Sequence, residues 1–356
     1  MSELEQKTLK NLPTETFLKE KFRSLGFEQL TSIQKKASPK IFEKKDSLII
    51  APTGSGKTEC TVIPIFSLVK KIKQQGKIKV LYVTPLRALN RDVFRRIIKY
   101  AELEDLTVQI RHGDTSQSLR KKISESPPDI LITTPETLVI LLTQKKMLAA
   151  LSELEWAVID EVHELLASER GSQLSLSLER LQLNSNQKIT RAGLSATVGN
   201  IEEAGQFLVG TNRSCKIIQD KSIRKYDVEV KFVKGSISEV ADSIIEYVEK
   251  SDINSPILLF TNTRGESEFL ASILKEKTLM NIELHHGSLS RQVREETESI
   301  LRSGASGIVV CTSSLELGLD IGSVELVIHY GSPRQVSKLM QRIGRSRHFK
   351  NSSAKG

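Results

Sequence analysis

Residues 51–58, APTGSGKT, combine the residue types that hold a phosphate group. Gly54 and Gly56 allow the backbone to turn its N–H groups toward an anion, where a β-carbon would interfere. Lys57 supplies a positive charge for β- and γ-phosphates, and the Thr58 hydroxyl is suited to Mg²⁺. An apolar run precedes the glycines and an apolar stretch follows, which predicts a strand, a loop and a helix whose N-terminus favours phosphate. A chance glycine-rich turn is the weaker interpretation.

A pair of carboxylates follows a second apolar run. Residues 156–164 read WAVIDEVHE, so Asp160 and Glu161 come directly after a predicted buried strand. We expect Asp160 to hold Mg²⁺, partly through water, and Glu161 to orient and deprotonate an attacking water. An adjacent acidic pair can also be the solvated start of a helix. Its place after a strand and downstream of a P-loop favours the catalytic interpretation.

The segment QRIGRSRH, residues 341–348, places three arginines within six residues. Arginine keeps its charge at every relevant pH and offers a planar fork of donors, so the cluster requires an anion nearby. From the residues alone that anion could be nucleic-acid phosphate, nucleotide phosphate or a neighbouring carboxylate.

Composition and charge narrow the classes of function. The 52 basic and 43 acidic residues give a formal charge of +9, which favours an anionic partner, nucleic acid first, although a basic solvated surface explains the charge equally well. Only 5% of the residues are aromatic, which argues against single-strand binding mainly by base stacking. Three scattered cysteines fit neither a disulfide framework nor a metal cluster. Because there is neither a signal peptide nor an apolar run of membrane-spanning length, we expect a cytoplasmic or nucleoid-associated protein.

Short apolar runs alternate with amphipathic stretches, and this pattern indicates parallel sheets covered by helices on both faces. The first set of expected strands is 47–51, 80–84, 130–134, 156–160 and 192–196. The second set is 228–233, 257–261, 282–286, 307–311 and 326–330. Ten strands are many for one sheet, so we expect two α/β domains, residues 1–215 and 216–356. Polar residues gather just past the strand ends, where open α/β sheets bind ligands.

Taken together, the motifs resemble those of superfamily 2 helicases. APTGSGKT, DEVH and the SAT of residues 195–197 occur in the order of that superfamily. LLFTNTR (258–264), CTSSLELGLDIG (311–322) and QRIGRSRH resemble its later motifs. The stretch from TSSLELGLDIG to QRIGRSRH is most similar to the Lhr (large helicase-related) group. The resemblance implies two tandem RecA-like domains with an ATP cleft between them.

The resemblance also implies roles around the nucleotide. Gln34 would read the adenine edge and Phe27 would stack on it, although a surface glutamine and a core phenylalanine remain alternatives. Contacts to ATP are expected from Thr53, Gly54, Ser55, Gly56, Lys57, Thr58, Gly318 and Asp320. Ser195 and Thr197 would couple the state of the nucleotide to strand binding.

For the arginine cluster, the resemblance favours the γ-phosphate of ATP bound to the other domain as the partner of Arg345. Gln341 would contact the same phosphate or its water. Arg342 would pair with a carboxylate across the cleft, such as Asp160 or Glu161. Residue 348 is histidine, as in the Lhr group, whereas the role of Arg347 stays open.

Further motifs resemble those that hold the sugar-phosphate backbone of one nucleic-acid strand. In the first domain these are TPLRALNRD, HGDT and TTPE, which contribute Thr84, Arg87, Gly113, Thr133 and Pro135. In the second domain the expected contacts are Thr261, Asn262, Arg264, His286, Gly287, Thr312 and Ser313. Backbone contacts carry little sequence information, so single-stranded or tailed DNA, RNA and hybrids all remain possible tracks.

The expected function is an ATP-dependent nucleic-acid helicase and translocase that uses Mg-ATP and moves 3′ to 5′, as the resemblance implies. The alternative is an ATP-gated binding or remodelling core that unwinds poorly. Lhr-like proteins continue past QRIGRSRH into a winged helix and further domains, whereas this sequence ends at Gly356, so a fragment or a minimal core is open. A small-molecule P-loop enzyme such as a kinase is the weakest interpretation, because it has no need of the second domain.

Overall fold

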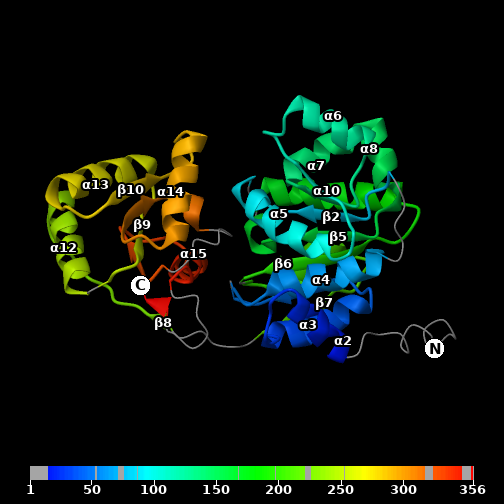
Figure 1. Cartoon of the computed structure of the whole chain (residues 1–356), viewed down its shortest axis with the longest axis horizontal. Coiled ribbons are helices and arrows are strands. Elements are labelled where there is room, and N and C mark those ends of the chain that lie inside the picture. Colours follow the sequence, from blue (N-terminus) through cyan, green and yellow to red (C-terminus); the bar gives the residue numbers. More distant parts are fainter. Residues whose placement is uncertain are drawn as a thin grey trace. The chain divides into compact units, whose positions relative to one another are not determined.

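The structure is a computed structural model that describes residues 15–52, 54–70, 76–85, 87–166, 168–196, 198–220, 226–251, 253–316, 324–346 and 354–355. The chain divides into two compact units, Met1–Lys221 and Ser222–Gly356, and each is built on its own parallel sheet (Figure 1). Two α/β domains were expected, and this fold class is confirmed. No helix in the described part of the chain is long and apolar enough to cross a membrane.

The first unit holds a seven-stranded sheet in the order β3-β4-β2-β5-β6-β1-β7. Its strands are β1 Ser47–Ile50, β2 Val80–Val83, β3 Val108–Arg111, β4 Ile130–Thr133, β5 Trp156–Ile159, β6 Thr190–Ser195 and β7 Lys216–Gln219. Its helices are α2 Glu15–Ser24, α3 Ser32–Phe42, α4 Lys57–Val69, α5 Arg87–Glu102, α6 Gln117–Glu125, α7 Pro135–Leu141, α8 Lys145–Ala150, η2 Leu151–Glu153, α9 Val162–Leu165, α10 Glu169–Asn184 and α11 Ile201–Val209.

Strand β1 shows why the apolar runs identify the central strands. Successive side chains of a strand point to opposite faces of the sheet. Ile49 lies in one hydrophobic core with Ile33 of α3 and Ile65 of α4, whereas Leu48 and Ile50 lie in a second core with residues of α10 and α11. Because both faces are covered, every residue of β1 is buried. The polar residues that follow the strand therefore emerge at the carboxyl edge of the sheet.

The two edge strands β3 and β7 were not predicted. Their sequences, VQIR and KIIQ, mix polar and apolar residues, and each strand is only partly buried. An edge strand has one neighbour and an open side, so it does not need the continuous apolar run of a central strand. Because β7 pairs with β1, the first unit extends to Lys221, beyond the predicted boundary after residue 215.

The second unit holds a four-stranded parallel sheet in the order β10-β11-β9-β12. Its elements are α12 Ile237–Lys250, β9 Pro256–Phe260, α13 Arg264–Lys277, β10 Ile282–His285, α14 Arg291–Ser303, β11 Gly307–Cys311, η3 Ser313–Leu315, β12 Leu326–His329 and α15 Val336–Ile343. Helices α12 and α13 cover one face, where Leu259 meets Leu270, and α14 covers the other, where Leu258 meets Leu301. A separate parallel pair joins β8 (Tyr226–Asp227) to β13 (Ala354–Lys355).

The predicted strand at residues 228–233 is wrong. The segment follows β8 but forms no strand, and Val230 and Phe232 are 92% and 88% exposed. Its alternation, VEVKFV, fits a half-buried strand. A strand also needs a neighbour that supplies backbone hydrogen bonds, and no described residue pairs with this segment.

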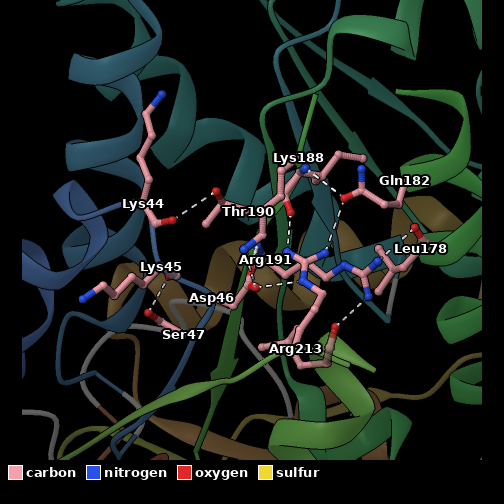
Figure 2. A network of polar contacts seen from close by, with 12 residues as sticks. Lys44, Lys45, Asp46, Ser47, Leu178, Gln182, Lys188, Thr190, Arg191 and Arg213 are labelled. Atoms are coloured by element: carbon pink, nitrogen blue, oxygen red, sulfur yellow. Dashed lines mark hydrogen bonds and ion pairs between the residues drawn. The ribbon is translucent and has the colours of Figure 1, made fainter. Parts of the chain in front are cut away.

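A buried polar network lies at the amino ends of β1 and β6 (Figure 2). The carboxylate of Asp46, just before β1, accepts hydrogen bonds from the backbone N–H of Arg191 at 2.8 Å and from the Arg213 guanidinium at 2.6 and 2.9 Å. Arg191 of β6 donates in turn to Glu179 at 2.9 Å and to the carbonyl oxygen of Leu178 at 3.2 Å. The network ties β1, β6 and α10 to the segment that leads into β7, at the sheet edge opposite the glycine loop.

An Asp46→Ala variant is expected to lower the free energy of unfolding of the first unit by about 3 kcal/mol, because the Arg213 guanidinium, 15% exposed, loses its carboxylate and the buried N–H of Arg191 loses its acceptor. The chain has a single tryptophan, Trp156, which is buried in β5, so its fluorescence during urea unfolding reports on this unit. The control is Asp114→Ala, since the Asp114 side chain is 64% exposed. Equal midpoints for the two variants would contradict a stabilising role for the network.

Candidate nucleotide and nucleic-acid sites

The glycine loop after β1 has the conformation that its sequence requires. Gly54 and Gly56 have φ angles of 75° and 88°, in the left-handed region that favours glycine. A β-carbon on Gly56 would also lie 2.3 Å from Nε2 of Gln34. Lys57 begins α4, and its buried ammonium group donates to the carbonyl oxygen of Ala51 at 2.6 Å. Thr53, a predicted ATP contact, lies outside the described residues.

Gln34 packs against this loop and is 1% exposed, so it is not a surface glutamine. Its Oε1 accepts the backbone N–H of Thr31 at 2.9 Å, and the Thr31 hydroxyl donates to the carbonyl oxygen of Ser55 at 2.7 Å. The start of α3 is thereby fixed to the glycine loop. Phe27 is partly buried, and its ring lies 5.7 Å from the ring of Phe22, which is the core packing left open as an alternative.

The acidic pair lies at the carboxyl end of β5, with Asp160 and Glu161 both buried. Oδ2 of Asp160 accepts the hydroxyl of Tyr82 at 2.7 Å, and Oδ1 accepts the backbone N–H of Glu161 at 2.9 Å. Burial raises the pKa of Asp160 to about 6 and the charge of Glu161 acts in the same direction, whereas the Tyr82 hydroxyl and the charges of Lys57 and Arg96 oppose them. Asp160 is therefore a buried carboxylate with a raised pKa that accepts one side-chain and one backbone hydrogen bond.

Glu161 has an unusual backbone conformation. Its φ and ψ angles are 47° and 50°, which places a residue with a β-carbon in the left-handed region at the turn into α9. Its Oε2 lies 3.5 Å from Nδ1 of His163. The same ring nitrogen lies 2.9 Å from the hydroxyl oxygen of Ser195, at the end of β6. Burial lowers the pKa of His163 to about 4, so the imidazole is neutral at pH 7 and connects the acidic pair to the SAT segment. Thr197 lies outside the described residues.

The predicted strand contacts of the first unit follow β2, β3 and β4, which are neighbours in the sheet. The side chains of Thr84, Thr133 and Pro135 are buried, and the Thr133 hydroxyl donates to the carbonyl oxygen of Arg111 at 2.7 Å. Gly113 is exposed. Arg87 begins α5, but its side chain lies outside the described residues. In this unit, a nucleic-acid strand could therefore reach the exposed backbone at Gly113 more easily than the buried side chains of Thr84, Thr133 and Pro135.

The predicted contacts of the second unit lie at the carboxyl ends of three adjacent strands, β10, β11 and β9. The exposed members are Asn262, Arg264, Gly287 and Ser313. The buried members are Thr261, His286 and Thr312. Nε2 of His286 lies 3.0 Å from the Glu268 carboxylate, and the Asn262 amide donates to the carbonyl oxygen of Ser332 at 3.0 Å. The structure thus gathers the seven residues at one edge and leaves four of them open to a ligand.

Glu316 organises the arginine cluster, and the predicted partner of Arg342 is wrong. Nε of Arg342 donates to Oε1 of Glu316 at 2.6 Å, and the guanidinium lies over the ring of Phe260, 5.0 Å from its centroid. Arg342 thus has its carboxylate inside its own unit. Arg345 donates from Nε and Nη2 to the carbonyl oxygen of Glu316, at 3.1 and 2.8 Å. Gln341 is buried beside them at 5% exposure, whereas Gly318, Asp320, Arg347 and His348 lie outside the described residues.

Two buried polar residues near the proposed nucleotide site were missed by sequence reasoning. Tyr82 lies inside the apolar run VLYVT, where an aromatic residue is expected to be core, yet its hydroxyl points to Asp160. Glu59 follows the glycine loop directly and is buried, with Tyr100 of α5 donating to it at 3.0 Å. The sequence did contain a signal for both residues. Each is a polar side chain at a position that the strand or helix pattern predicts to be buried, and a buried polar group needs a partner.

Two family models match most of the chain. Residues 31–204 match the DEAD/DEAH box helicase family, and residues 205–350 match the helicase conserved C-terminal domain. The ATP-dependent helicase Lhr-Core of Methanocaldococcus jannaschii is 38% identical, over 97% of this chain and 43% of that relative. The chain therefore spans less than half the length of this curated relative.

Solved structures share the fold. The Mycobacterium smegmatis helicase Lhr, solved bound to single-stranded DNA and AMP-PNP, is 33% identical with a TM-score of 0.80 over 98% of this chain and 48% of that one. A DEAD-box helicase solved bound to single-stranded RNA has a TM-score of 0.81 over 97% of this chain and 73% of its own. At 24% identity the second likeness shows the fold alone, two RecA-like domains.

Proposed function

The chain belongs to the superfamily 2 helicases, most like the Lhr group, and we propose on this basis that it couples ATP hydrolysis to movement along single-stranded nucleic acid. One observation supports this most directly. The carboxyl edge of the first sheet carries the glycine loop, the acidic pair and Ser195 after β1, β5 and β6, and the predicted strand contacts after β2, β3 and β4. Nucleotide and strand would bind to one edge of one sheet.

The residues of the first unit fit ATP with Mg²⁺. Mg²⁺ prefers oxygen ligands, and the Thr58 hydroxyl and the Asp160 carboxylate supply them. Lys57 and the N–H groups of the glycine loop would hold the phosphates. When bound, Mg²⁺ would neutralise charge on the phosphate oxygens. Glu161 would orient the attacking water and accept its proton.

Arg345 and Gln341 of the second unit would complete the reaction on the nucleotide held by the first. An arginine that contacts the γ-phosphate stabilises the charge of the transition state. The two hydrogen bonds from Arg345 to the Glu316 carbonyl oxygen fix the plane of its guanidinium, which prepares it for such a role. Hydrolysis would then remove its partner, and the loss of that contact would drive the conformational change.

The track is proposed to be single-stranded nucleic acid, with DNA as the first choice, because the Mycobacterium smegmatis relative was solved bound to single-stranded DNA. Asn262, Arg264, Gly287 and Ser313 are the exposed residues that would contact its backbone. Such contacts position a strand without reading its sequence. Movement from 3′ to 5′ belongs to the same proposal, since the resemblance to the Lhr group implies it.

The test is steady-state ATPase activity, alone and with saturating single-stranded DNA or RNA, followed by unwinding of duplexes with a 3′ or a 5′ tail. Strong stimulation by one polymer and opening of the 3′-tailed duplex would support the proposal. Opening of the 5′-tailed duplex alone would reject the polarity. ATP turnover that ignores both polymers would reject nucleic acid as the coupled ligand.

The same assays separate the alternative, an ATP-gated binding or remodelling core. That core would hydrolyse ATP in response to nucleic acid but open neither tailed duplex. The chain spans less than half the length of its Lhr-Core relative, so residues outside it could supply strand separation in that protein.

A Tyr82→Phe variant is expected to need more Mg²⁺ for half-maximal ATPase activity, and more so at pH 6 than at pH 8. The Tyr82 hydroxyl favours the ionised form of Asp160, so its removal raises the pKa of Asp160 further above its ordinary value. Protons then compete with the metal for the carboxylate as the pH falls. The measurement is a Mg²⁺ titration at each pH, with Tyr330→Phe as the control. An unchanged Mg²⁺ requirement at pH 6 would contradict the role of the hydroxyl.

A further inference from the structure

Helices α4 and α5 share a buried polar contact that neither the nucleotide site nor the strand site uses. Glu59 is the third residue of α4, directly after Thr58, and is 6% exposed. Its Oε1 accepts the hydroxyl of Tyr100 at 3.0 Å and Nη1 of Arg96 at 3.3 Å. Both donors lie on α5, so the contact joins the two helices.

If its only role were to pack α4 against α5, this polar contact would be a costly way to do so. The helix α4 is otherwise buried among apolar side chains, and a buried carboxylate loses its hydration. The Arg96 side chain is 35% exposed, so this partly exposed ion pair adds little to stability on its own. Tight packing of α4 against α5 therefore does not require Glu59 and Arg96. A role in the reaction cycle gives them a reason to be there.

Arg96 lies beside the acidic strand as well as the glycine-loop helix. Its positive charge acts to lower the pKa of Asp160 and of Tyr82, against the larger effect of burial on each. One guanidinium thus contacts Glu59 and also acts through its charge on Asp160, the carboxylate proposed to hold Mg²⁺.

The other end of α5 reaches the strand site. The helix begins at Arg87, two residues after Pro85, and Thr84 and Pro85 directly follow β2. Arg96 is nine positions further on, which is about 13 Å along a helix axis at a rise of about 1.5 Å per residue. A helix moves as a unit over this length. A displacement at its first turn is therefore carried to the contact with Glu59.

We propose that Arg96 is a positioning residue through which strand binding at the start of α5 sets α4 and its glycine loop for ATP. The proposal rests on the proposed function, since it requires both ligands to bind the first unit. Arg96 touches neither ligand in this scheme. It acts through its contact with Glu59 on α4.

The test measures how strongly the two ligands affect each other's binding. Fluorescence anisotropy gives the Kd of a labelled single-stranded DNA with and without Mg²⁺ and AMP-PNP. The Kd without nucleotide divided by the Kd with nucleotide is the coupling ratio. Arg96→Gln is expected to reduce this ratio on the order of tenfold, within the usual range of coupling between sites. The Kd for DNA alone should stay within about twofold, because Arg96 does not contact the strand.

Matched variants separate coupling from stability. Arg95→Gln removes the same charge from an exposed neighbour on α5 and is expected to keep the wild-type ratio. Tyr100→Phe removes one hydroxyl from Glu59 and should reduce the ratio less than Arg96→Gln does. If Arg96→Gln unfolds, Tyr100→Phe serves as the test instead. A merely structural role would lower the melting temperature and leave the ratio unchanged.

The outcomes distinguish this inference from the proposed function. A wild-type ratio well above one that persists in Arg96→Gln and Tyr100→Phe would overturn the inference and leave the proposed function intact. A wild-type ratio of one, with DNA and with RNA, would overturn both. Selective loss of the ratio in the two variants would support the role of Arg96.

Discussion

A Glu161→Gln variant is expected to lose at least about 100-fold in the kcat of nucleic-acid-stimulated ATP hydrolysis, because it removes the proposed general base and keeps the size of the side chain. The KM for ATP should stay within about threefold, since the phosphates would be held by the glycine loop and Lys57. Steady-state phosphate release with saturating single-stranded DNA measures both quantities.

The matched control is Glu164→Gln, one turn further along the same short helix. Glu164 also faces His163, with 3.5 Å between Oε1 and Nε2, so the control removes an acidic charge from the same imidazole. If the two variants lost activity equally, the loss would come from the surroundings of His163. Full activity in Glu161→Gln would remove Glu161 from the mechanism. Binding of labelled AMP-PNP confirms that each variant still holds nucleotide.

An Arg345→Ala variant is expected to lower kcat by about 1,000-fold, the lower end of the range for an arginine that stabilises a transferring phosphoryl group. Arg345→Lys should not restore activity, because one ammonium group cannot replace a planar fork that is oriented by two hydrogen bonds to Glu316. Steady-state ATPase activity at saturating DNA and ATP gives the comparison.

Because Arg345 is buried, its removal could also disturb the second unit, and two measurements separate the causes. Arg302→Ala, on α14 of the same unit, is the control for lost charge. Millimolar guanidinium ion should partly restore the activity of Arg345→Ala if the side chain acts on the phosphate. A variant that is inactive with guanidinium yet melts at the wild-type temperature would reject that chemical role.

The sequence predicted the central strands of both sheets and the edge strands of the second sheet, but it missed both edge strands of the first sheet, for a physical reason. Strands such as β1 are covered on both faces, so they appear as uninterrupted apolar runs. The edge strands β3 and β7 have mixed sequences and were missed. Segment 228–233 is the opposite case, a predicted strand that the structure does not form. Its alternating pattern predicts a strand, but the hydrogen bonds that make a strand belong to a neighbour and are not encoded in the segment itself.

The candidate site shows the same division between local and distant information. The glycine loop and the acidic pair are contiguous motifs, and the structure places each at a strand end. The partner of Arg342 could not be predicted, because Glu316 is 26 positions earlier in the chain and the two side chains meet only in the folded second unit. Tyr82 was hidden because only the position of its hydroxyl, not its residue type, distinguishes it from a core aromatic residue.

At position 161 the backbone conformation favours one residue type and the proposed chemistry requires another, because Glu161 lies in the left-handed region. Glycine adopts this conformation freely and asparagine tolerates it, whereas glutamate bears a cost of about 1 kcal/mol. A sequence designed for this backbone by stability alone would therefore choose glycine or asparagine at position 161. That design would be more stable but would lack the carboxylate that is proposed to accept a proton from water. Engineering this protein for thermal tolerance should consequently treat position 161 as fixed and seek its gains elsewhere in the fold.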